Sequence, residues 1–443
     1  MGHQGHLKQE YRELVHRLDA GTTGMPEPAD PTAWQGWKEI LEILFTPEDA
    51  ALAARLPVLP ASLERIAART GLRPEVLKPR LDAMADKGLV LDLVSKRTGK
   101  VSYLLSPPVV GFFEFSMMRA HDSIPKKRMA EALQAYMHHD ESFARGVFGN
   151  DTVIGRALAH ETTFGYGPIP DVLDWERATR VIETATDIAV SLCYCRHKAE
   201  HLGTSCGAPV EICLSLNGGA EFVLRRDFGK RIGKERALAI LSDARERGLV
   251  QIADNVRDRP SYLCNCCGCC CGQLQGINQY GFRAVNPSGF IATHHPGTCA
   301  GCSRCARACP IAAITMIPSR SAIPGKKNDM HPRVDRESCI GCGVCADACN
   351  KDAMRMERRE KQPFVPQNAV DRALRVALER GKLADLLFDE GESRGHRVLN
   401  HMLKALTRLP PAQRALASEQ VKSRFVKAAL AQVRDPSASA VHG

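Results

Sequence analysis

The feature that most constrains this chain is a cysteine pattern that occurs twice near residue 300. The spacing C-x2-C-x2-C-x3-C is found between residues 299 and 309 and again between residues 339 and 349. The two runs also form an internal repeat, because the segment CAGCSRCARACPIAAITM is similar to the later segment CIGCGVCADACNKDAMRM. Three cysteines at this spacing lie on one tight loop, and the fourth follows one helical turn later. The repeat therefore predicts two compact groups of thiolate ligands.

This spacing is typical of cysteines that bind a [4Fe–4S] cluster. Zinc sites usually combine C-x2-C pairs that are separated by a longer loop, and they do not need a third cysteine at the same step. A disulfide framework would require an exported chain. We therefore expect iron–sulfur clusters at these eight cysteines.

On these residues the segment resembles the bacterial two-cluster ferredoxin family, a small βαβ pair related by a pseudo-twofold axis. The resemblance implies that the fourth cysteine of each run binds the cluster of the other run. One [4Fe–4S] cluster would then be held by Cys299, Cys302, Cys305 and Cys349, and the second by Cys339, Cys342, Cys345 and Cys309. The sequence departs from the family pattern at Asn350, where the first run has a proline, and in a long loop over residues 317–333.

Length, composition and charge restrict the class of protein. The 443 residues suffice for two to four domains. No run approaches the roughly 20 apolar residues of a membrane span, and the polar N-terminus lacks the apolar core of a signal peptide. We therefore expect a cytoplasmic protein, in which 18 cysteines indicate metal chemistry. The formal net charge of +10 leaves an excess of roughly +6 after two clusters of about −2 each, which would suit an acidic partner protein or nucleic acid.

The order of expected elements indicates an α+β multidomain protein. We expect an N-terminal helix and linker, a winged-helix-like unit, a cysteine-rich α/β region, the ferredoxin-like βαβ pair and a helical C-terminal region. The corresponding boundaries are residues 1–33, 34–120, 121–290, 291–360 and 361–443. Helices are expected from residue 111 to about residue 180, and near residues 368–381, 399–406 and 422–427.

Residues 62–105 resemble the winged-helix family. They read as a helix, a turn, a second helix and two strands around SKRTG. Nine lysines and arginines against five acidic residues would suit DNA binding by the second helix and by the turn at Lys96–Lys100. Pro79 lies inside that second helix, however, and no dense basic patch is present. We therefore favour a docking or scaffold role over DNA binding.

A second group of ten cysteines lies upstream of the ferredoxin-like segment. A strand is expected at residues 188–192, and its continuation would place Cys193 and Cys195 on one face. With Cys206 and Cys213 they form a candidate four-thiolate set, to which His197 and His201 could add nitrogen ligands for zinc. The other six lie in the run CNCCGCCCG: Cys264, Cys266, Cys267, Cys269, Cys270 and Cys271.

The run CNCCGCCCG follows a segment whose sequence is similar to part of the winged-helix-like unit. LSDARERGLVQIADNVRDRPSYL parallels LDAMADKGLVLDLVSKRTGKVSYL, so we expect a helix and a hairpin whose last strand delivers the cysteines. Adjacent cysteines with glycine resemble the paired-cysteine modules of heterodisulfide reductases, although the flanking spacing differs. Ten cysteines exceed the needs of one cube, so one or two further cubes, a larger cluster, or zinc all remain open.

No dinucleotide-binding, Walker A or hydrolase signature occurs in the sequence. Our first hypothesis is an iron–sulfur protein that transfers electrons to a partner oxidoreductase. The second is a regulator in which cluster state controls DNA binding by the winged helix. The third is a reductase with its active centre at residues 264–271, supplied with electrons by the two cubes.

Overall fold

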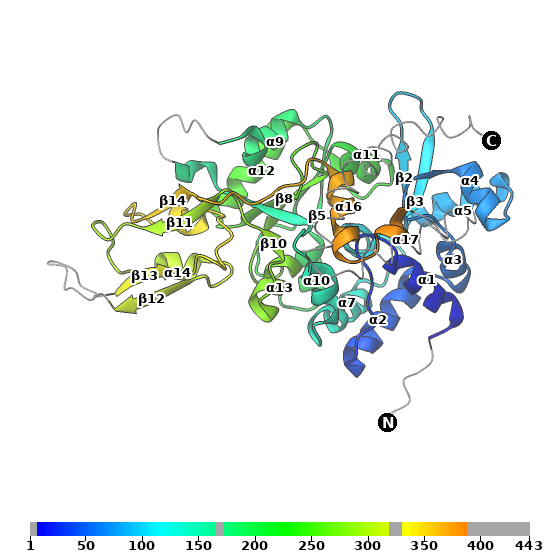
Figure 1. The fold of residues 1–443 in the computed structure, drawn as a ribbon, viewed down its shortest axis with the longest axis horizontal. Helices are drawn as coiled ribbons and strands as arrows, with labels where there is room; N and C mark the ends of the chain where they lie inside the picture. Colours follow the sequence, from blue (N-terminus) through cyan, green and yellow to red (C-terminus); the bar gives the residue numbers. More distant parts are fainter. Residues whose placement is uncertain (1–6, 165–171, 319–329, 388–443) are drawn as a thin grey trace.

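The computed structural model describes residues 7–164, 172–318 and 330–387. Helices and strands are mixed along the chain. Figure 1 shows the N-terminal helices at one end of the molecule, a large sheet in the middle and two small hairpin-like sheets at the other end. No helix in the described ranges combines the length and the apolar character that crossing a bilayer requires. The expected helices at residues 399–406 and 422–427 lie outside the described residues.

The N-terminal part is mainly helical and has its own core. Trp37, Ile40, Leu41 and Leu44 are buried on one face of α2, as the helical spacing predicts. Thr46 Oγ1 accepts the backbone N–H of Asp49 and caps α3, as expected. The elements up to residue 148 are α1 (Gln9–Asp19), α2 (Pro31–Leu44), α3 (Pro47–Ala53), β1 (Ala61–Ser62), α4 (Leu63–Thr70), α5 (Pro74–Asp86), β2 (Val90–Val94), β3 (Val101–Leu105), α6 (Phe113–Met117), α7 (Lys126–His138) and α8 (Ser142–Phe148).

Helices α4 and α5 and the small sheet β1-β3-β2 follow the order expected from residues 62–105. Pro79 is accommodated inside α5. The phenylalanines of residues 112–115 serve as core residues, since Phe112 and Phe113 are fully buried and contact each other edge to face. The first core therefore consists mainly of residues between Leu7 and Phe148, and Ile154 and Ala284 of the central region join it.

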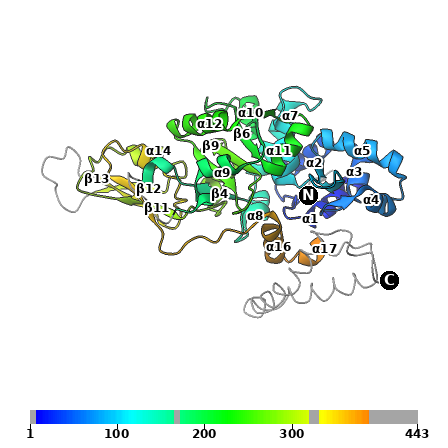
Figure 2. The same cartoon turned by 90° about the horizontal axis from the view of Figure 1, so that it is seen from above.

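A seven-stranded sheet forms the centre, in the order β10-β4-β8-β9-β6-β5-β7. All neighbouring strands are antiparallel except β10 and β4. Helices α9 and α12 pack against one face through apolar residues of β5, β6 and β9 (Figure 2). The elements are β4 (Gly155–Leu158), α9 (Ala178–Thr184), β5 (Ile188–Leu192), α10 (Tyr194–His201), β6 (Glu211–Leu216), α11 (Asn217–Arg225), β7 (Lys230–Arg231), α12 (Lys234–Glu246), β8 (Val250–Asp254), β9 (Tyr262–Cys266), α13 (Gly272–Tyr280) and β10 (Val285–Asn286).

Two local predictions about this sheet have opposite outcomes. The helix and hairpin expected before the cysteine run are confirmed as α12, β8 and β9. The helical stretch expected to reach residue 180 is wrong, because β4 occupies residues 155–158 in the interior of the sheet. All four residues of β4 are buried, so the strand has no alternation between polar and apolar residues that would distinguish it.

The ferredoxin-like segment forms two antiparallel strand pairs, β11 with β14 and β12 with β13. Its elements are β11 (Phe290–His294), α14 (Arg304–Ala308), β12 (Ile314–Pro318), β13 (Met330–Val334), α15 (Val344–Asp347) and β14 (Met354–Arg358). Each half therefore contains a short helix between two strands, which is the arrangement expected from the internal repeat.

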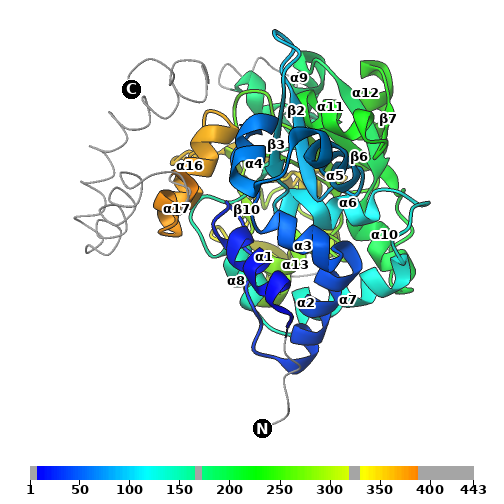
Figure 3. The same ribbon diagram turned by 90° about the vertical axis from the view of Figure 1, so that its right-hand side faces the viewer.

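The chain then returns to the N-terminal part. Helix α16 (Ala369–Glu379) begins with Asn368, whose side chain accepts the backbone N–H groups of Val370 and Asp371 as expected. Helix α17 (Leu383–Leu387) follows it. Arg380 and Lys382 both form ion pairs with Asp19 of α1. Figure 3, viewed from the N-terminal end, shows α16 and α17 beside the helices of that part.

Candidate metal centres

The cysteines of the ferredoxin-like segment lie on two tight loops. Each loop ends in a residue with a left-handed backbone, Ser303 before α14 and Gly343 before α15, at φ values of 62° and 85°. These turns reverse the chain directly before the third cysteine of each run, which brings the three thiols of a loop to the same side. Cys302 is exposed, whereas Cys299, Cys305, Cys342 and Cys345 are buried.

One quartet of these thiols lines a small pocket. Cys309, Cys339, Cys342 and Cys345 surround it together with apolar residues such as Ile314 and Ile340. Burial raises the pKa of the Cys342 thiol to about 12. Four thiols converge there on an apolar space with few competing polar groups, so the donor set fits a [4Fe–4S] cluster.

The other quartet is also assembled across the repeat. Cys305 lies close enough to Cys349 and Cys299 for their charges to raise the pKa of its thiol, after the larger effect of burial. Backbone N–H groups point at sulfur in both quartets, from Gly301 to Cys299 Sγ at 3.4 Å and from Ala313 to Cys309 Sγ at 3.2 Å. Such N–H donors stabilise thiolate charge, and they tune the potential of a bound cluster.

A buried histidine joins the ferredoxin-like segment to the central sheet. The backbone N–H of His160 donates to the carbonyl of Cys342 at 3.0 Å. Its ring nitrogens contact Asp347 Oδ2 at 2.7 Å and the carbonyl of Leu249 at 3.0 Å. Burial alone would raise the pKa of Asp347, but the hydrogen bond and the charge of His160 hold that pKa below its usual value. Sequence analysis did not identify His160, because an isolated histidine carries no motif.

Six upstream cysteines form a closed ring of thiol contacts, which we call the six-thiol ring. The members come from β6, β9 and the starts of α10 and α13. Each thiol contacts the next in the order Cys193, Cys195, Cys271, Cys266, Cys264, Cys213 and back to Cys193. The sheet register accounts for part of the ring, since Leu214 lies opposite Leu263 and therefore places Cys213 next to Cys264.

Two helix N-termini converge on the six-thiol ring. Strand β5 ends at Leu192 and does not continue to Cys195, and Cys193 instead occupies the N-cap position of α10. Cys271 occupies the N-cap position of α13. Contacts from neighbouring thiols lower the pKa of both Cys193 and Cys271 well below the usual value, and backbone N–H groups of the helix add to this effect. Burial acts in the opposite direction but is outweighed. The same thiol contacts, together with burial, raise the pKa of Cys195, Cys213 and Cys266, so thiolate character alternates around the ring.

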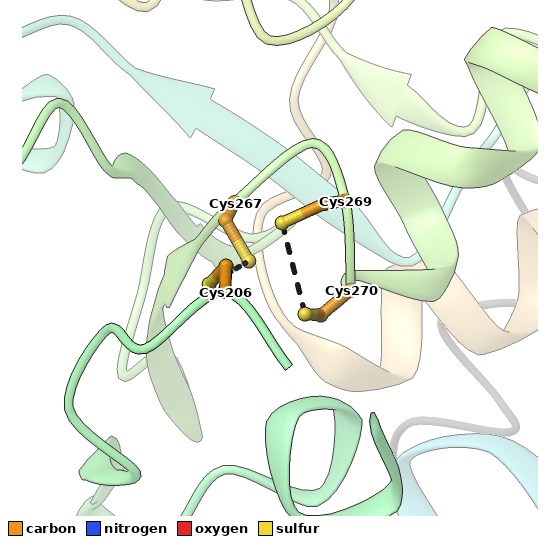
Figure 4. Close-up of side chains that lie close together, drawn as sticks. All are labelled: Cys206, Cys267, Cys269 and Cys270. Atoms are coloured by element: carbon orange, nitrogen blue, oxygen red, sulfur yellow. Dashed lines mark hydrogen bonds between the residues drawn. The ribbon is translucent and has the colours of Figure 1, made fainter. Parts of the chain in front are cut away.

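The remaining four upstream cysteines form a second group, which we call the four-thiol site. The ligand atoms of Cys206, Cys267, Cys269 and Cys270 all lie within 4.8 Å of one another. The Sγ–Sγ distances are 3.6 Å for Cys206–Cys267 and 3.7 Å for Cys269–Cys270. Figure 4 shows the thiols pointing toward one another from two separate loops.

This partition differs from the grouping expected from the sequence. Cys206 was grouped with Cys193, Cys195 and Cys213, but it lies with the cysteines of the β9–α13 loop instead. The run CNCCGCCCG is itself divided, because Cys264, Cys266 and Cys271 belong to the six-thiol ring and the other three belong to the four-thiol site. The alternation of β9 and the turn after it direct these neighbours to different sides.

Two buried cations of α10 lie near both thiol groups. Arg196 is fully buried and donates to the carbonyls of Pro209 and Asn265. Lys198 is 4% exposed and donates to Gln134. Burial lowers the pKa of Lys198, and the nearby thiols of Cys195, Cys270 and Cys271 partly oppose that shift. Only their position on the same helix as Cys195 could have drawn attention to them in the sequence.

The histidine pair of α10 is confirmed as neighbours on one helix. His197 Nδ1 contacts the carbonyl of Met117 at 2.7 Å, and His201 Nε2 lies 3.2 Å from His197 Nε2. Neither histidine belongs to the four-thiol site. The expected nitrogen ligands are therefore occupied with contacts to the protein and to each other.

Comparison with known protein families matches residues 298–353 to the 4Fe-4S dicluster domain family, Fer4_7. No curated protein matches the chain significantly. No solved structure does so either. The match covers the eight cysteines of the repeated pattern. The chain therefore contains a 4Fe–4S ferredoxin-like domain and is an iron–sulfur protein.

Proposed function

We propose that this protein transfers electrons between an external redox partner and a further iron–sulfur cluster on the six-thiol ring. The ferredoxin-like domain would hold two [4Fe–4S] clusters, one on Cys299, Cys302, Cys305 and Cys349 and one on Cys339, Cys342, Cys345 and Cys309. Bound clusters of this kind supply one-electron oxidation and reduction. The residues of the chain hold the ligands in place, exclude water and set the local charge.

The observation that carries the proposal is a hydrophobic core shared by the two thiol-rich regions. Cys266 and Cys271 of the six-thiol ring pack in one cluster with Cys342, Ile340 and Val344 of the ferredoxin-like domain. Cys309 and Cys339 lie against the same cluster. A shared, dry core keeps two redox groups close and free of intervening water, which favours electron exchange between them.

Backbone contacts support the same junction. Gly268 of the cysteine-rich loop lies so close to Pro310 that a Cβ at this position would overlap the proline carbonyl. Asn278 of α13 donates to that carbonyl at 3.0 Å. Pro310 directly follows Cys309, so the loop that supplies thiols to both upstream groups lies against a ligand of the second ferredoxin quartet.

The exposure of the thiols suggests where electrons enter or leave the protein. Cys302 in the first quartet is exposed, whereas the second quartet faces the central sheet. A partner protein could therefore exchange electrons at the Cys302 side, and the second quartet would connect that side with the six-thiol ring. The partner itself would be a one-electron donor or acceptor, and the basic excess of the chain favours an acidic surface on it.

Contacts of the winged-helix-like region argue against the DNA-binding alternative. Lys96 at the turn between β2 and β3 pairs with Asp187 and Glu221 of the central region. Asp82 and Asp86 of the second helix, α5, pair with Arg226. The side chains that would face DNA are thus partly committed to an internal interface, which favours the docking role.

The test is an iron and acid-labile sulfide count on anaerobically purified full-length protein, with electron paramagnetic resonance of the reduced form. The wild type should contain more iron than the about eight atoms that two [4Fe–4S] clusters hold. Cys264→Ser should lower the count to about eight while leaving the ferredoxin signals, and Cys342→Ser should lose a ferredoxin signal. About eight irons in the wild type and no effect of Cys264→Ser would remove the cluster on the ring. Absence of iron and sulfide would remove the whole proposal.

A further inference from the structure

The four-thiol site has the dimensions of a single metal ion. A zinc ion bound at about 2.3 Å to four tetrahedral thiolates separates its sulfurs by about 3.8 Å. The Sγ–Sγ distances of 3.6 Å and 3.7 Å and the outer limit of 4.8 Å agree with that spacing. A cube places each thiolate on a different iron, so its sulfurs lie farther apart. Among the residues that the structure describes, no other group of three or more metal-ligating side chains gathers so closely, the ferredoxin cysteines included.

The charges around the site suit a dianionic tetrathiolate centre. Zinc with four thiolates carries about −2 in total. Arg196 lies near Cys193 of the six-thiol ring as well as Cys267, and Lys198 lies near Cys195 as well as Cys270. Within the described residues, Arg196 donates to carbonyls and Lys198 to the amide of Gln134, and no carboxylate pairs with either. The buried Nε of Arg196 also lacks a hydrogen-bond partner. A buried cation without a counter-ion is costly, so negative charge at the neighbouring thiols would offset that cost.

The site connects two loops that are distant in sequence. Cys206 lies in the loop between α10 and β6, and Gly203 and Gly207 on either side adopt left-handed φ values of 70° and 71°. Cys267, Cys269 and Cys270 lie on the β9–α13 loop, whose Gly268 contacts Pro310. Cys206 and Cys269 are exposed, so solvent and chelators can reach the site.

We propose that Cys206, Cys267, Cys269 and Cys270 bind one Zn²⁺ in a tetrahedral tetrathiolate site that fastens the β9–α13 loop to the α10–β6 loop. The ion keeps the cysteine-rich loop in place against the ferredoxin-like domain. This role is structural and goes beyond the proposed electron transfer, because Zn²⁺ has no redox chemistry. It does not depend on the cluster at the six-thiol ring.

The experiment measures zinc, iron and sulfide per chain in full-length, anaerobically purified protein. The wild type should contain about one zinc ion per chain. Cys206→Ser and Cys269→Ser should each lose the zinc and keep the iron, the sulfide and the signals of the reduced ferredoxin-like domain. Cys213→Ser is the matched control, because it removes a thiol of the six-thiol ring and should keep the zinc.

A second measurement does not depend on how well the variants fold. Wild-type protein treated with a chelator and then with Co²⁺ should show the ligand-field absorption of tetrahedral cobalt thiolate, and added Zn²⁺ should abolish it. Zinc-free wild type, loss of iron and sulfide on Cys206→Ser, or a mononuclear iron spectrum would each overturn the assignment. Wild-type protein that contains zinc but no iron would contradict only the proposed electron transfer.

Discussion

At the scale of single residues, burial rather than sequence neighbourhood determines the chemistry of Glu114. This carboxylate lies on α6, and the charge of Cys264 acts on it. Burial raises its pKa from 4.5 to about 7, although backbone N–H groups including that of Gly111 partly oppose the shift. Glu114 therefore keeps its proton in the folded protein over a pH range in which the unfolded chain has lost it.

Glu114→Gln should change how stability depends on pH. Between pH 4.5 and about 7 the folded wild type binds more protons than the unfolded chain, so its stability falls as pH rises through this range. Glutamine stays neutral and can still accept the Gly111 N–H. We expect equal stability of the two proteins near pH 5 and an advantage of about 1–3 kcal/mol for the variant at pH 8. Urea unfolding at several pH values measures this, and parallel pH profiles would contradict it.

At the scale of elements, the packing of the β9–α13 loop against the ferredoxin-like domain depends on a missing side chain. Gly268 approaches Pro310 more closely than any Cβ would allow. The loop also carries three thiols of the four-thiol site and connects strand β9 to helix α13, both of which supply thiols to the six-thiol ring. A displacement of this loop should therefore affect both stability and communication between the domains.

Gly268→Ala should destabilise the protein by about 1–3 kcal/mol, because the added methyl group forces the loop away from Pro310. It should also slow reduction of the upstream centre while leaving reduction of the ferredoxin-like domain unchanged. Gly218→Ala is the matched control, since nothing lies within 4 Å of a Cβ there. Thermal unfolding and rapid-mixing reduction kinetics measure the two effects. Equal behaviour of the two variants would show that the close approach at Pro310 is unimportant.

Helix α11 fastens the winged-helix-like region to the centre through a compact ion-pair network. Arg226 contacts Asp82 at 2.9 Å, Asp86 at 2.8 Å and Asp92 at 3.0 Å. Burial would raise the pKa of Asp92, but hydrogen bonds from Arg225 and Arg226 hold that pKa below its usual value. The carboxylate of Asp92 is 4% exposed, so its charge depends on these partners.

Arg226→Ala should cost about 3 kcal/mol of stability, since it removes a partner from a buried carboxylate. Arg247→Ala is the control, because Arg247 pairs with Asp243 on the surface and both side chains are about half exposed. That control should lose less than about 1 kcal/mol. Denaturant titration of the full chain gives both values. A loss of similar size in the two variants would mean that the interface contributes no more than a surface pair.

At the scale of the whole molecule, the parts follow one another along its length, and the segment after β14 returns to contact the N-terminal helices. The ferredoxin-like domain lies at one end, the central sheet follows, and the N-terminal part lies at the other end (Figure 1). After β14 the chain returns along the molecule to Asp19 of α1. The winged-helix-like region packs against α11 of the central region through β2 instead of standing free.

This arrangement predicts that the full-length protein does not bind DNA selectively. Lys96, which would contact the backbone in a DNA-binding wing, already has two carboxylate partners. We expect retention on DNA to be weak, equal for unrelated sequences and abolished by moderate salt. Electrophoretic mobility shifts with random and selected duplexes at two salt concentrations test this. Sequence-selective binding that survives at the higher salt would support the regulator hypothesis instead.

The sequence alone determined the features that depend on neighbours along the chain. The cysteine spacing indicated the ferredoxin-like domain, the caps at Thr46 and Asn368 marked helix starts, and the similar segment before residue 264 revealed a helix and hairpin. Each of these signals is a local preference of a few consecutive residues. The uniformly buried strand β4 had no such preference and was missed.

Tertiary structure alone decided how the ten upstream cysteines are divided. Cys206 contacts Cys267 across 61 positions of sequence, and Cys213 meets Cys264 because of the pairing of β6 with β9. The buried charges of Arg196 and Lys198 and the contact of Gly268 with Pro310 likewise depend on the packing of separate elements. Spacing shows which residues can bind metal, but the meeting of distant strands and loops determines which of them share a site.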